Sequence, residues 1–71
     1  MPDLRQDLRA TEESIRRDAD QMKTLEEQKE RLDPADPQVL RISEHVERIA
    51  AGLQDKAAAE RELSERIQAG N

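Results

Sequence analysis

The chain has 71 residues, of which 41% are charged and 34% hydrophobic, and its net charge is −5. It contains one His, no Cys and no aromatic residue, which excludes disulfides and leaves only carboxylates as ligands for a metal. The acidic balance disfavours the phosphate backbone of nucleic acids and anionic lipid surfaces.

No apolar run approaches the roughly 20 residues of a membrane span. The first residues, MPDLRQDLR, lack the apolar core of an export signal. We therefore expect a cytoplasmic protein without a membrane partner, cofactor, metal or small-molecule ligand.

The first predicted element is a helix over about residues 3–32. Its apolar residues recur at alternating steps of four and three, and the polar residues Thr11, Asp18 and Lys29 fill the gaps in the series. This 3.5-residue period is typical of a coiled-coil seam. The apolar seam residues of this half are Leu4, Leu8, Ile15, Met22, Leu25 and Leu32.

A turn is predicted next, at residues 33–36, within the stretch LDPADPQVL. Pro34 disfavours helical geometry in the residue before it, so the first helix should end near Leu32. Asp36 suits the N-cap of the next helix, and Pro37 suits its first position, where a missing N–H costs nothing.

The second predicted helix covers about residues 37–69. Ala35, before its N-cap, can pack against Leu40 as a hydrophobic staple. The seam continues at the same spacing, with Lys56 and Glu60 as its polar members. Its apolar residues are Val39, Ile42, Val46, Ile49, Leu53, Leu63 and Ile67.

The two seams match if the chain folds back at the turn. In an antiparallel hairpin, facing residues have numbers with a constant sum, and both Leu32 with Val39 and Leu4 with Ile67 add up to 71. The sequence therefore predicts one all-α domain, an antiparallel two-helix coiled-coil hairpin. The alternative, one long helix in a parallel coiled coil, is opposed by the two prolines of the middle stretch.

The polar seam residues suggest specific contacts. Asp18 and Lys56 lean toward each other across the seam, because helical side chains point toward their own N-terminus. We expect an ion pair between them that helps to set the register of the helices. Thr11 and Glu60 are level and could hydrogen-bond, and Lys29 should extend its ammonium group to solvent.

Small residues lie at heptad spacing beside the second seam. They either reflect the high helix propensity of Ala or allow another helix to approach closely. Because a lone hairpin covers only one side of its seam, we expect a homodimer that forms a four-helix bundle, or docking on a partner's helices. The possible oligomer stripe is Ser43, Ala50, Ala57 and Ser64.

The sequence contains no recognised catalytic motif, and His45 has no second His beside it. The predicted function is a non-catalytic structural, adaptor or regulatory module that binds proteins through helix packing. One alternative is a nucleic-acid accessory protein with a local basic patch, which the acidic total opposes. That patch would consist of Arg5, Arg9, Arg16 and Arg17.

A second alternative comes from the run DPQVLRISEHVERI, residues 36–49. This run, about a fifth of the chain, resembles the second-helix motif of small helical-hairpin phosphatases that act on the aspartyl phosphate of sporulation response regulators. The resemblance implies that Glu47 stands at the acidic position on which that activity depends, where the family has Asp. Glu44 replaces the usual Gln. The matching or nearly matching positions are Val39, Leu40, Ser43, Val46 and Ile49.

Overall fold

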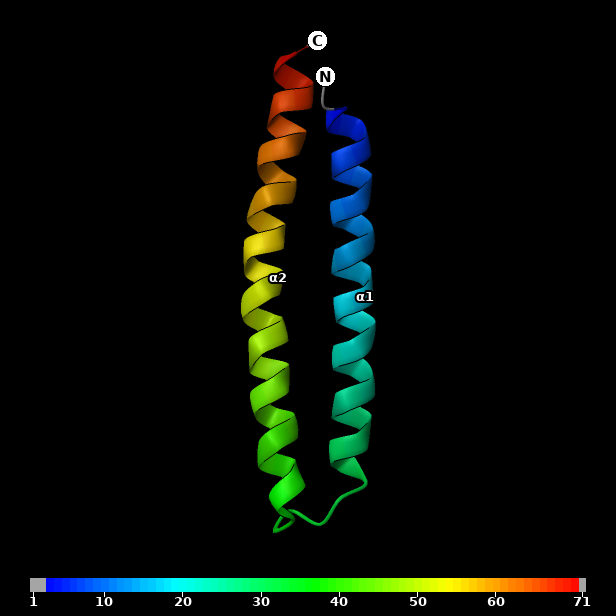
Figure 1. The fold of residues 1–71 in the computed structure, drawn as a ribbon, viewed down its shortest axis with the longest axis vertical. Coiled ribbons are helices and arrows are strands. Elements are labelled where there is room, and N and C mark those ends of the chain that lie inside the picture. Colours follow the sequence, from blue (N-terminus) through cyan, green and yellow to red (C-terminus); the bar gives the residue numbers. More distant parts are fainter. Residues whose placement is uncertain (1–2, 71) are drawn as a thin grey trace.

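A computed structural model describes residues 3–70, which form two α-helices packed against each other (Figure 1). Helix α1 spans Leu4–Glu30 and helix α2 spans Pro37–Ala69. The start of α1 and the end of α2 lie at one end of the rod and the turn lies at the other, so the helices run antiparallel. The predicted all-α hairpin is confirmed, and a single long helix is excluded.

Neither helix of residues 3–70 combines the length and the apolar character that crossing a bilayer requires.

The boundary between α1 and the turn lies slightly earlier than predicted. The helix ends at Glu30 rather than at Leu32. The N–H groups of Arg31 and Leu32 each donate to the carbonyl three residues back, at 3.2 Å, instead of four residues back. This tighter last turn lets the chain leave the helix before Pro34, which restricts the backbone of the residue preceding it.

Carboxylates cap the start of both helices. Asp3 accepts a hydrogen bond from the backbone N–H of Arg5 at 3.0 Å. Asp36 accepts one from the backbone N–H of Gln38 at 2.9 Å, and Pro37 opens the helix. Each cap satisfies an N–H group that has no partner within its helix and places negative charge at the positive end of the helix dipole.

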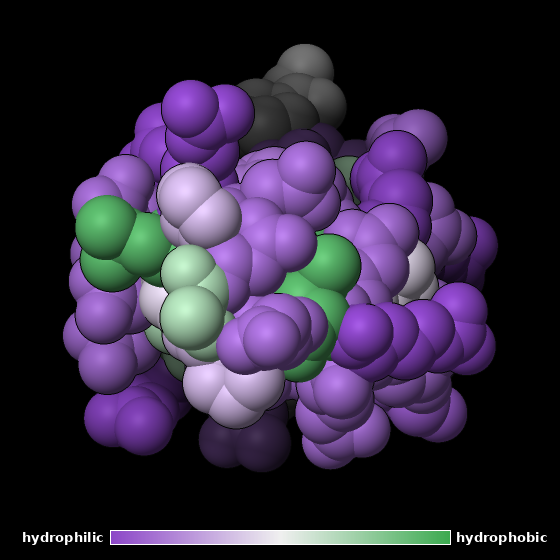
Figure 2. All heavy atoms as spheres, turned by 90° about the horizontal axis from the view of Figure 1, so that it is seen from below, coloured by the Kyte–Doolittle hydropathy of each residue, from purple (hydrophilic) through white to green (hydrophobic). Residues whose placement is uncertain are grey.

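No side chain of residues 3–70 is buried, so this part of the chain has no fully covered interior. Leu40 is the most open large apolar side chain described, at 65% exposed, so the expected staple with Ala35 leaves most of it uncovered. Seen from the turn end, the surface is mainly hydrophilic, with separate hydrophobic patches (Figure 2). The two helices alone do not enclose a core.

The cap at Asp36 gives a stability prediction. Asp36→Ala removes the acceptor for the N–H of Gln38 and should lower the free energy of unfolding by about 1 kcal/mol, measured by urea denaturation followed by circular dichroism. Asp55→Ala is the control, because it replaces an exposed Asp inside α2 with a better helix former. Equal stability of the Asp36→Ala variant and the native chain would contradict the capping role.

Candidate interaction surface

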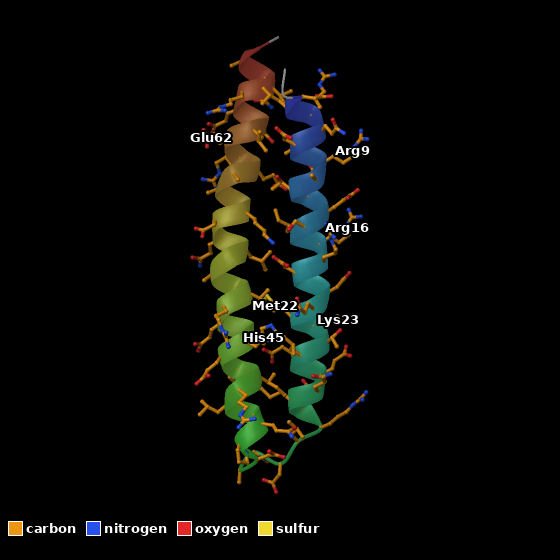
Figure 3. All side chains as sticks on the ribbon, viewed as in Figure 1. Arg9, Arg16, Met22, Lys23, His45 and Glu62 are labelled. Carbon is orange, nitrogen blue, oxygen red and sulfur yellow. The ribbon has the colours of Figure 1, made fainter. Side chains whose placement is uncertain are left out.

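The predicted seam residues are partly covered in the hairpin. Every apolar seam residue is half-exposed, and so are the polar seam residues Thr11, Asp18, Lys29, Lys56 and Glu60. Partial cover of this kind is expected where two helices pack against each other, and Leu32 lies beyond the end of α1. Met22, labelled in Figure 3, lies between the two helices.

Asp18 and Lys56 meet across the seam. Lys56 Nζ lies 2.5 Å from Asp18 Oδ2 and donates a hydrogen bond to it. The Asp18 side chain is 21% exposed and the Lys56 side chain 36%. This is the one ion pair between α1 and α2 in the described part of the chain, and it joins the helices near the middle of their length.

The other polar seam residues of α1 find partners within their own helix. Lys29 Nζ reaches Glu26 at 3.8 Å, so its ammonium group leaves the seam. The Thr11 hydroxyl donates to the carbonyl of Asp7 at 2.9 Å. A bond from Thr11 to Glu60 is absent among residues 3–70, because the carbonyl one turn back is a nearer acceptor.

Two different flanks border the seam. One, the acidic flank, carries the heptad e positions, counted with Leu4 and Ile42 as d positions of the seam, and it includes the predicted stripe. Within that stripe Ala57 is exposed, and the other three residues are half-exposed. The acidic flank consists of Arg5, Glu12, Ala19 and Glu26 from α1 and Ser43, Ala50, Ala57 and Ser64 from α2.

The opposite flank carries the heptad g positions and has no Asp, Glu, Lys or Arg over its middle. The stripe of small residues lies on the acidic flank and does not show how the two flanks differ. Comparing the charged residues on both flanks of both helices shows the difference. We call this surface the uncharged flank: Ser14, Gln21 and Gln28 from α1 and His45, Gly52 and Ala59 from α2.

Gly52 lies in the interior of α2, where Gly is about 1 kcal/mol less favourable than Ala. A Cβ atom added at Gly52 would meet nothing within 4 Å. The contact between α1 and α2 therefore does not require a glycine here.

The basic residues of the nucleic-acid alternative lie on exposed surface. Arg9 and Arg16 point outward from α1, away from α2 (Figure 3). A shallow hollow on this face is lined by Glu13, Arg16, Arg17 and Asp20, which contribute equal numbers of positive and negative charges. The arginines thus lie among carboxylates, and the patch has no net positive charge at the hollow.

The segment behind the phosphatase resemblance lies on the first turns of α2. Glu44 and Glu47 are exposed, whereas Ser43 and His45 are half-exposed. Within residues 3–70, no group of three or more His, Cys, Asp or Glu side chains is arranged to hold a metal ion. The segment presents a carboxylate at Glu47 on open surface.

The seam ion pair predicts a measurable coupling. A double-mutant cycle with Asp18→Ala and Lys56→Ala should give a coupling free energy of about 0.5–1 kcal/mol, measured by chemical denaturation. Arg66 and Glu62, 2.8 Å apart and more than 60% exposed, form the control pair, for which about 0.3 kcal/mol is expected. Additive effects of the Asp18 and Lys56 substitutions would show that the seam pair does not stabilise the hairpin.

No family model, no curated protein and no solved structure matches this chain.

Proposed function

We propose that the chain is a non-catalytic interaction module that self-associates through coiled-coil packing of its two helices. Two hairpins would form a four-helix bundle, in which each hairpin covers the open side of the other's seam. The bundle would then serve as a structural or adaptor element that holds attached or bound proteins together.

The observation that supports this proposal is the exposure of the seam. The apolar seam residues are all half-exposed, and no residue of 3–70 is buried. Apolar surface removed from water contributes roughly 25 cal/mol per Å². A second hairpin packed over the seam would remove this apolar surface from water along the length of the rod. Two helices alone cannot cover their own seam in this way.

The short chain gives a second reason. Below about 70–80 residues a single core rarely contributes enough stability, and small proteins gain the rest from disulfides, metals or association. Cysteine is absent from the sequence, and His45 is the sole histidine. Regular helix packing and association are the remaining sources, and association is the one that would also cover the open seam.

The ion pair between Asp18 and Lys56 would gain importance in the bundle. In the single hairpin, both side chains keep contact with water. Covered by a second hairpin, they would be costly to separate, because an unpaired charge in a covered seam is strongly unfavourable. The pair would thus disfavour bundles in which the helices have slipped along each other.

Self-association is measured by sedimentation velocity and light scattering at protein concentrations of 1–100 µM. We expect a dimer of twice the chain mass at the upper concentrations and dissociation on dilution. A folded, helical monomer over the whole range would contradict self-association. Docking on the helices of another protein would then be the remaining form of the interaction hypothesis.

A further inference from the structure

We propose that a second copy of this chain docks on the uncharged flank, with the two-fold axis parallel to the helices and both turns at the same end. This inference rests on the proposed self-association and specifies its surface and orientation. Three observations support it: the charges of the two flanks, the open space at Gly52, and the match between the helices across the axis.

The acidic flank is the less favourable surface to cover. Glu26 on this flank holds the ammonium group of Lys29 at 3.8 Å, with their side chains 49% and 37% exposed. Glu12 adds a second carboxylate on the same side. Covering this flank would take these charges out of water, and the desolvation of an ion pair often exceeds the attraction within it.

The uncharged flank avoids that cost and has room for a close approach. Between Asp7 and Arg66, which lie at its far end from the turn, it carries only Ser, Gln, His, Gly and Ala. Gly52 lies near the middle of α2, and the space where its Cβ would project is empty. A helix of a second copy can approach α2 most closely at this point, because a glycine has no side chain to keep it away.

Symmetry brings complementary residues together on this flank. With the axis parallel to the helices, α1 of one copy faces α2 of the other. An axis parallel to the helices keeps the sum of 71 for level positions, so Gln21 lies level with position 50 of the second copy and about 3 Å along the helix from Gly52. The long Gln21 side chain can span this offset and reach the empty space at Gly52. Asp7 is offset by about the same 3 Å from Arg66 of the second copy, which these side chains can span, and the two have opposite charges.

Within the single chain, Arg66 pairs with Glu62 on its own helix, at 2.8 Å, and its side chain remains 61% exposed. An Arg side chain has five N–H donors, so a second carboxylate can bind beside the first. The ends of the flank are therefore able to form two equivalent ion pairs across the dimer. A reversed arrangement that sets Ser14 against Gln21 would instead set Asp7 against Gln28 of the second copy.

The size of the flank suits a dimer. The rod measures 54 × 17 × 14 Å, so one broad face has an area of roughly 900 Å², close to the ~800 Å² per partner of a standard protein interface.

The surface is tested by placing one large side chain on each side of α2. Gly52→Leu should weaken the dimer tenfold or more in sedimentation equilibrium, because overpacking at a close approach is unfavourable. Ala51→Leu, on the exposed outer face, and Ala57→Leu, on the acidic flank, are the matched controls and should change the dissociation constant less than threefold. Leu is a good helix former, so circular dichroism should show full helicity in all three.

The orientation is tested by cross-linking, for which the native chain offers no competing Cys. Chains carrying Ser14→Cys are mixed with chains carrying Ala59→Cys, and mild oxidation should join the two kinds of chain as a disulfide-linked heterodimer. A mixture of Ser14→Cys with Gln21→Cys chains is the control for the reversed arrangement and should give little cross-linking.

The outcomes separate this inference from the proposed function. A native dimer that is dissociated by Ala57→Leu and not by Gly52→Leu would overturn the choice of flank and leave self-association intact. Efficient cross-linking of Ser14→Cys with Gln21→Cys would overturn the orientation. A native chain that stays monomeric would overturn both the inference and the proposed self-association.

Discussion

Two helices packed side by side each cover one stripe of the other, and every side chain in the line between them stays open on the outer side. This constraint determines the exposure pattern of the hairpin, in which the seam residues are half-exposed and none of residues 3–70 is buried. The turn, the ion pair and the two flanks can each be described by their relation to this open seam. The turn aligns the two halves of the seam, the ion pair joins them across it, and the flanks differ in how readily they can be covered.

The turn sets the alignment through two Asp–Pro pairs with different effects. Pro34 follows the tightened end of α1, and Asp36 caps the start of α2 with Pro37 beside it. Six residues, 31–36, thus separate the two antiparallel helices. Since Asp18 and Lys56 meet only in this register, the local chemistry of the turn and the ion pair near mid-length favour the same alignment.

Much of the fold follows from simple patterns in the sequence. The 3.5-residue period, the constant sum of facing residues and the proline positions predict two antiparallel helices of the observed extent. The end of α1 was predicted two residues late, because its last turn closes with bonds to the carbonyls three residues back, and spacing alone does not reveal this. The Thr11 hydroxyl likewise follows a local preference for its own helix over a level residue across the seam.

The candidate surface is harder to predict from the sequence than the fold. The small residues Ser43, Ala50, Ala57 and Ser64 form a visible stripe, but small size does not distinguish a contact surface from a helix with high Ala content. The charges of the two flanks can be compared once the seams are assigned, but two further facts come from three-dimensional geometry: the direction taken by the Lys29 ammonium group and the empty space at Gly52. Both facts depend on atomic positions, which the sequence pattern does not give.

The proposed self-association would link the stability of the hairpin to its assembly. If the outer side of the seam is covered only by a second chain, the folded state gains part of its stability from association, and that part depends on protein concentration. A helical partner that covers the same surface would have the same effect, so the unfolding equilibrium reports on the covering of the seam whatever covers it.

The most direct test of the central claim is the urea midpoint of the purified chain at increasing protein concentration. A hundredfold increase should stabilise an associating fold by about 2.7 kcal/mol per dimer and raise the midpoint steadily. A midpoint that stays constant from 1 to 100 µM, with full helicity before the transition, would show that the hairpin is stable with its seam open and would contradict the account.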